Sequence, residues 1–97
     1  MELMTSVTDD VMTLKISGRF DFSGHNALRQ AYEGTHHIRY VIDLAGTEYM
    51  DSAALGMLLQ LREFAGGTME AVRIINASPT IRKVLEVANF DRLMEVI

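Results

Sequence analysis

The chain has 97 residues, 48% of them hydrophobic, which is enough to build the core of one small domain over residues 1–97. Nine Lys and Arg against thirteen Asp and Glu give a net charge of −4, which opposes nucleic-acid binding because such binding depends on basic residues. The lack of cysteine excludes disulfides and thiolate metal sites. The N-terminal stretch lacks signal-peptide features and no apolar run reaches bilayer length, so we expect a cytoplasmic protein without membrane insertion.

The first third of the chain predicts two strands and a helix. Residues 11–20 alternate apolar and polar side chains, which is typical of a strand with one buried face. Residues 2–8 are expected to pair with that strand as a hairpin, because Asp9 and Asp10 favour turns. Apolar residues at helical spacing then predict a helix over residues 23–32, with Gly34 beyond its end.

The remaining residues continue the alternation of strands and helices. Residues 38–44 are β-branched and aromatic, which predicts a central strand, and a short loop then leads to a helix over residues 52–64 that stops before Gly66 and Gly67. Residues 71–77 predict the next strand. Ser78 and Pro79 open a third helix that ends near Asn89, and the tail at 90–97 is expected to add a short edge segment. The pattern indicates a single α/β domain with a mixed, mostly parallel sheet of four to five strands and crossover helices.

The stretch MDSAALGMLLQL, from Met50 to Leu61, contains the candidate functional site. Asp and Ser are both strong helix N-cap residues, and only one is needed to bond a free N–H of the first turn. If Asp51 caps the helix, the Ser52 hydroxyl is available to a partner. By itself, however, Asp-Ser before an apolar helix is most often only a cap.

Helical periodicity predicts that one face of this helix is exposed. Ser52, Gly56, Gln60 and Glu63 fall within a sector of about 80°, and Gly56 leaves a low patch over which another protein can pack. Met57 and Phe64 are expected at the margin of this sector as contact residues. The opposite sector, which should face the sheet, is apolar except for Arg62; its apolar members are Ala54, Leu58, Leu61 and Ala65.

The segment VIDLAGTEYMDSAALGMLL resembles the signature of STAS domains, the sulphate transporter and anti-sigma factor antagonist family. It has an apolar strand ending in Asp-Leu, a short loop, Asp-Ser, then Leu-Gly and an aliphatic run. The preceding LKISGRFDFSGHNAL and the following VRIINASPTIRKVLEVANFDRLMEVI are similar to the flanking elements of the same family. The resemblance therefore covers essentially the whole chain and implies a STAS-like fold.

The resemblance implies a role for three residues. In stand-alone antagonists of the family, the serine after the motif Asp is phosphorylated, and these positions are Ser52 and Asp51 here. Asp21 matches the Asp of the upstream Gly-x-x-Asp element, near the phosphorylation site, where two roles remain open: bonding local backbone, or a direct part in phosphotransfer. Many members carry Ser or Thr and then Gly after the phosphorylated serine, whereas this chain has Ala53 and Ala54, so Ser52 is the single acceptor in the motif.

The implied function is that of an anti-sigma factor antagonist. When Ser52 is unphosphorylated, such a protein binds an anti-sigma factor, commonly a serine kinase, and a serine phosphatase of the PP2C type or a related type resets the switch. We expect the free protein to be a monomer. The alternative is the small STAS subunit of a bacterial phospholipid-transport ATP-binding cassette complex, in which the same helix face would dock permanently on the ATPase.

Other residue combinations give weaker signals for chemistry. Asp21, Ser23 and His25 have the residue types of a hydrolytic triad, but their spacing in one loop does not give convergent geometry. His36 and His37 diverge as neighbours and are expected to be solvated loop residues rather than metal ligands. The sequence contains no phosphate-binding or dinucleotide-binding glycine motif. We therefore expect no cofactor, no metal and no enzymatic activity of the chain alone.

Overall fold

A five-stranded sheet in the order β1-β2-β3-β4-β5 forms the centre of the computed structural model, which describes residues 1–37 and 39–97. The strands are β1 (Glu2–Thr8), β2 (Val11–Phe20), β3 (Arg39–Met50), β4 (Val72–Ile75) and β5 (Glu95–Val96). β1 and β2 are antiparallel, and the remaining neighbours are parallel. The predicted mixed, mostly parallel α/β sheet is therefore confirmed.

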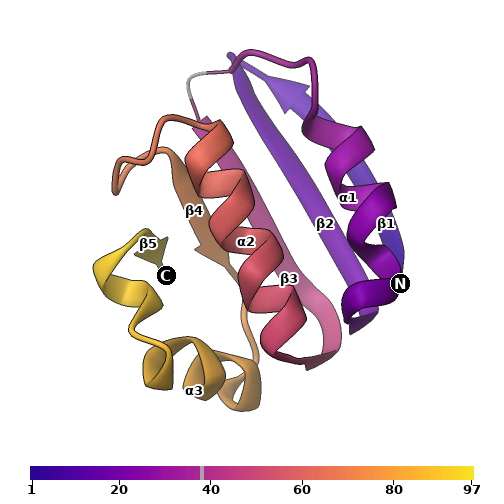
Figure 1. Cartoon of the computed structure of the whole chain (residues 1–97), viewed down its shortest axis with the longest axis vertical. Helices are drawn as coiled ribbons and strands as arrows, with labels where there is room; N and C mark the ends of the chain where they lie inside the picture. Colours follow the sequence, from indigo (N-terminus) through magenta and orange to yellow (C-terminus); the bar gives the residue numbers. More distant parts are fainter. Residues whose placement is uncertain (38) are drawn as a thin grey trace.

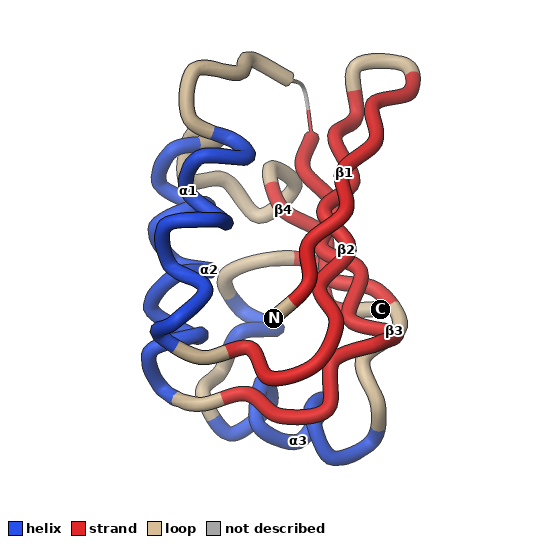
Figure 2. The backbone as a smooth tube through the Cα atoms, turned by 90° about the vertical axis from the view of Figure 1, so that its right-hand side faces the viewer, coloured by secondary structure: helices blue, strands red, loops and turns tan. Residues whose placement is uncertain are grey.

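Two helices cover one face of this sheet (Figures 1 and 2). These are α1 (His25–Tyr32) and α2 (Ser52–Phe64), and α2 has the predicted bounds. The third helix, α3 (Pro79–Val87), contacts β3 and lies at the lower end of the molecule in Figure 1. Short 3-10 turns, η1 (Phe22–Gly24) and η2 (Phe90–Arg92), precede α1 and β5. Among the described residues, no helix has both the length and the apolar character that a bilayer crossing requires.

The β1–β2 hairpin forms as its turn residues predict. Thr8 is paired with Val11, so only Asp9 and Asp10 connect the strands. Both aspartates have positive φ, 51° and 62°, which is the conformation that a two-residue type I′ turn requires. Short polar side chains such as Asp adopt this conformation more readily than branched ones.

The hydrophobic core lies between the sheet and the helices. Alternate residues of the strands point to the helix side and are fully buried there, as the apolar periodicity predicts. The helices supply the opposing layer from the sides that face the sheet. Side chains with 0% exposure include Leu14, Ile16, Ile42, Leu44, Ile74, Leu58, Leu61 and Leu85.

The third strand is longer than the sequence predicts. Instead of ending at Leu44, β3 continues to Met50, so strand rather than loop leads to α2. Its second half stays paired with β2 through two register shifts, and the buried Thr47 donates its hydroxyl to the Ile16 carbonyl at 2.8 Å. These irregularities break the apolar alternation, which is why periodicity does not predict the extension. The predicted start at Ile38 lies outside the described residues.

Two other boundaries differ from the sequence prediction. The helix expected from Ser23 begins at His25, because Asp21 caps a 3-10 turn over Phe22–Gly24 first. The strand expected over residues 71–77 is limited to Val72–Ile75, and Asn76 follows it with a φ of 62°. By contrast, Ser78 caps α3 as predicted, since its hydroxyl accepts the Ile81 N–H.

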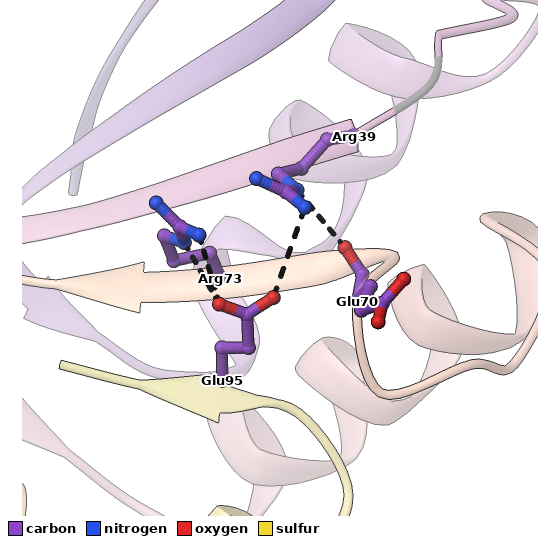
Figure 3. A network of polar contacts seen from close by, with 4 residues as sticks. All are labelled: Arg39, Glu70, Arg73 and Glu95. Carbon is purple, nitrogen blue, oxygen red and sulfur yellow. Dashed lines mark hydrogen bonds and ion pairs between the residues drawn. The ribbon is translucent and has the colours of Figure 1, made fainter.

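Ion pairs on the sheet face opposite the helices hold the C-terminal segment in place (Figure 3). Glu95 of β5 accepts bonds from the Arg73 guanidinium at 2.9 and 3.1 Å, and Arg39 approaches its other oxygen at 3.9 Å. On the helix side, Arg62 donates to the Leu93 carbonyl at 2.7 Å. This bond explains why a charged residue interrupts the apolar sector of α2.

The structure corrects the expectation that both His36 and His37 are solvated loop residues. The Nδ1 of His37 lies 3.0 Å from the Asp10 carboxylate, and its side chain is only 16% exposed. The ring also packs edge-on against Tyr40, with 5.6 Å between centroids. His37 is therefore a contact between the α1–β3 connection and the hairpin tip rather than a solvated loop residue, whereas His36 is exposed as expected.

Candidate functional site

The α2 N-terminus separates the roles of Asp51 and Ser52. Asp51 is the N-cap, with extended backbone, and its Oδ1 accepts the Ala54 N–H at 3.0 Å. Ser52 is the first residue of the helix and is exposed. Within the described residues, its hydroxyl has no hydrogen-bond partner. Capping by Asp51, which the sequence left open, therefore leaves the Ser52 hydroxyl spare, and the predicted exposure of Ser52 is confirmed.

Strand pairing brings Asp21 to the same edge of the sheet. Phe20 at the end of β2 is paired with Met50 at the end of β3. Asp21 directly follows β2 and Asp51 directly follows β3. They therefore leave the sheet from adjacent strand ends, whose spacing is about 5 Å. The sequence places these residues 30 positions apart, and the parallel register makes them neighbours of Ser52.

The Asp21 carboxylate holds its own loop in shape. Its Oδ1 accepts both the hydroxyl of Ser23, at 2.5 Å, and the Ser23 backbone N–H, at 3.0 Å. These bonds, together with Arg19 at 3.7 Å, keep the pKa of Asp21 below its usual value, the Ser23 hydroxyl contributing most. His25 meanwhile approaches Asn26 and stacks on Phe22, so Asp21, Ser23 and His25 do not form a catalytic relay.

The exposed face of α2 contains most of the residues that periodicity predicts. Ser52, Gln60 and Glu63 are exposed, and Gly56 is partly exposed between them. A Cβ added at Gly56 would meet no atom within 4 Å, so the glycine is not required by packing inside the domain. The face is thus low at its centre and polar at its far end.

The structure corrects the expected position of Met57. This residue was expected at the exposed margin but is only 4% exposed, so it cannot serve as a contact residue. The reason is that α1 lies beside α2, with the Tyr32 and Phe64 rings 4.9 Å apart, and widens the buried sector on that side. Phe64 remains 40% exposed.

Several exposed residues at this edge were missed by the sequence analysis. Leu59, 37% exposed, lies on the same side of α2 as Ser52, and its i+7 spacing from Ser52 was a usable signal. Phe22 in the β2–α1 loop is 69% exposed. Arg19 and Tyr49 are strand partners whose side chains stack, with 3.9 Å from guanidinium to ring centroid, and only the register of the sheet shows this.

The site is acidic and organised around one hydroxyl. The strand register brings the carboxylates of Asp21 and Asp51 to the sheet edge at Ser52, Arg19 pairs with Asp21, and the positive end of the α2 dipole lies beneath Ser52. A hollow of about 390 Å³ between α1 and α2 continues the surface past Gln60 and Glu63. The arrangement therefore places an exposed hydroxyl at one end of an open helix face.

Comparison with known proteins places this site in a family. The family model described as "Mlab, STAS domain" matches residues 3–95. A STAS-domain containing protein of Pseudomonas aeruginosa (strain UCBPP-PA14) is 43% identical over 95 residues, covering 96% of this chain and 94% of the relative.

Solved structures show the same fold at lower identity. An anti-sigma factor antagonist from Mycobacterium paratuberculosis superposes with a TM-score of 0.84 at 23% identity, covering 98% of this chain and 83% of that one. The anti-sigma factor antagonist SpoIIAA in its unphosphorylated form gives 0.80 at 19% identity, covering 99% and 88%. The Bacillus SpoIIAA in its phosphorylated form gives 0.69 at 20% identity, covering 99% and 91%. Because the family model matches nearly the whole chain, residues 3–95, the chain belongs to the STAS domain family.

Proposed function

We propose that this protein is an anti-sigma factor antagonist whose binding is switched by phosphorylation of Ser52. The observation that carries the proposal is the division of roles at the α2 N-terminus: Asp51 caps the helix, and the exposed Ser52 hydroxyl has no partner among the described residues. Proteins of similar structure include anti-sigma factor antagonists, and SpoIIAA is known in unphosphorylated and phosphorylated forms. In this proposal the chain is a binding protein and not an enzyme.

The partner would be an anti-sigma factor with serine kinase activity. It binds the unmodified face of α2 and so releases its sigma factor, in the cytoplasm. A separate serine phosphatase, of the PP2C type or a related type, restores the hydroxyl. The docking face is the exposed side of α2 from Ser52 to Glu63, with Gly56 allowing close approach and Leu59 supplying apolar area in place of the buried Met57.

Phosphate on Ser52 would change binding more than folding. It adds about −1.5 to −2 charges and considerable bulk. The helix N-terminus favours an anion by about 0.3–1 kcal/mol, so the domain should remain folded. A partner carboxylate about 5 Å away would be repelled by about 3 kcal/mol per unit charge at an effective dielectric near 20, enough to weaken association about a hundredfold.

The test starts by identifying the partner and the modification. The wild-type chain is used as bait in its source cell, captured proteins are identified, and phosphopeptides of the chain are mapped. Calorimetry with the purified partner then compares wild type, Ser52→Ala, Ser52→Asp and the phosphoprotein. We expect Ser52→Ala to bind as wild type does, and Ser52→Asp and the phosphoprotein to bind about a hundredfold more weakly.

Thr68→Asp is the matched control. It places the same new charge on an exposed hydroxyl residue beyond the C-terminal end of α2, at the opposite end of the helix from Ser52, and should leave affinity unchanged. Circular dichroism should be the same for all variants. Equal affinity of the phosphorylated and unphosphorylated forms would refute the switch. A transporter ATPase as the captured partner would instead support the permanent STAS subunit of a phospholipid-transport complex.

A further inference from the structure

The outer edge of β1 is a long strand edge that faces solvent. β1 pairs with β2 along one side over all seven residues, Glu2 to Thr8. Six of these residues are exposed and Leu3 is partly buried. The opposite edge of the sheet, formed by β5, has only two residues. Figure 1 shows β1 at the margin of the sheet beside α1. Strand β2 lies between β1 and β3, the strand that leads to α2.

This edge lacks the features that usually keep strand edges apart. Exposed edges are commonly protected by lysine, proline or inward-pointing charges. The sequence ELMTSVT of β1 contains a single charged residue, Glu2, and no lysine or proline. Two of its large apolar side chains are well exposed, Met4 at 69% and Val7 at 55%. A nearly uncharged edge of this length is a template for pairing with another strand.

In place of the monomer expected from the sequence, we propose that β1 pairs antiparallel with β1 of a second copy of this chain, with Thr5 on the two-fold axis. A register centred on Thr5 is the one that pairs every residue of the strand, since Glu2 then faces Thr8, Leu3 faces Val7 and Met4 faces Ser6. An isologous contact of this kind joins the two sheets into one continuous ten-stranded sheet.

The side chains are complementary in this register. Leu3 and Val7 lie on the helix side, since their β2 partners, Ile16 and Met12, are buried in the core. Leu3 of one copy therefore meets Val7 of the other on the helix side, so these two apolar residues face each other on both sides of the axis. On the opposite face Met4 contacts Ser6, and no like charges face each other because Glu2 lies opposite Thr8.

The dimer leaves the Ser52 face of α2 open. This inference is independent of the proposed function, because β1 and α2 lie on different parts of the molecule. A dimer would present two phosphorylatable serines and two docking faces in a single particle.

Sedimentation of charge-swap variants tests the pairing and its register. We expect the wild type to sediment at twice the 10.9 kDa chain mass as concentration is raised. Thr5→Lys and Thr5→Glu should each remain monomeric, because each places two like charges together on the axis. An equimolar mixture of the two variants should regain the dimer, because unlike charges then meet.

Controls separate this contact from misfolding and from other interfaces. Thr68→Lys makes the same change in an exposed residue outside β1 and should dimerise as wild type does. Circular dichroism should be unchanged, and β1 amide hydrogen exchange in the wild type should slow with concentration. A wild type that stays monomeric, a dimer that survives both Thr5 variants, or a mixture that stays monomeric would each overturn the proposal.

Discussion

At the scale of single residues, Asp51 and Ser52 divide two tasks between adjacent side chains. The Asp51 carboxylate accepts the Ala54 N–H, and the exposed Ser52 hydroxyl is the group for which we propose phosphorylation. The sequence offers both residues as caps without deciding between them, while its periodicity places Ser52 on the exposed side. It does not predict the position of Met57, because burial there depends on α1, whose contact with α2 is set by the tertiary fold.

The capping role of Asp51 can be tested by stability. Asp51→Ala removes the side-chain bond to Ala54 and should lower the free energy of unfolding by about 1 kcal/mol. Asp51→Asn is the matched control, because its amide oxygen can still cap while its charge is removed, and it should lie close to wild type. Urea unfolding followed by circular dichroism measures both. Equal stability of the Ala and Asn variants would show that the bond contributes nothing.

At the scale of elements, the site depends on where strands end rather than on any local motif. The pairing of Phe20 with Met50 places Asp21 beside Asp51. The sequence indicates both strands but gives no register, and the β3 extension to Met50 depends on bulges and on the bond from Thr47 to Ile16. Element existence was therefore predictable from apolar patterning, while the meeting of the two aspartates was supported only by family resemblance.

Variants of Gly56 can separate the packing of α2 from its proposed role in docking. Since a Cβ there meets no neighbouring atom, Gly56→Ala should raise the free energy of unfolding by about 0.5–1 kcal/mol through better helix propensity. Gly56→Gln should keep the fold as stable as wild type but weaken partner capture, because its side chain stands where the partner must approach. Thermal unfolding and calorimetry measure the two effects. A loss of stability in Gly56→Ala would show that the glycine serves internal packing.

At the scale of the whole molecule, the sheet has two different sides and two different edges. The helix side holds the core and the Ser52 site, while the other side holds the ion pairs of Glu95 with Arg73 and Arg39. The fold class and the hairpin turn follow from apolar patterning and from the turn preference of Asp. The contact of His37 with Asp10 and the bond of Arg62 to Leu93 do not, because each joins residues at least 27 positions apart.

Alanine variants of two adjacent leucines of α2 should affect different properties, one the stability of the domain and the other its affinity for the partner. Leu58 is fully buried, whereas Leu59 is 37% exposed on the face of α2 that we propose for docking. Leu58→Ala should cost about 2–5 kcal/mol, a large part of the roughly 5–15 kcal/mol that stabilises a domain of this size. Leu59→Ala should change stability by less than about 1 kcal/mol but weaken partner binding, because its apolar area is lost from the contact.

Both leucine variants make the same chemical change at neighbouring positions, so each serves as the control for the other. Denaturant unfolding gives the stability of each variant, and calorimetry gives its affinity under conditions in which it is fully folded. Folded Leu58→Ala should bind the partner as wild type does, because its side chain lies 0% exposed beneath the docking face. If Leu59→Ala bound the partner with unchanged affinity, the partner would not dock on this side of α2, and the proposed location of the docking face would be wrong.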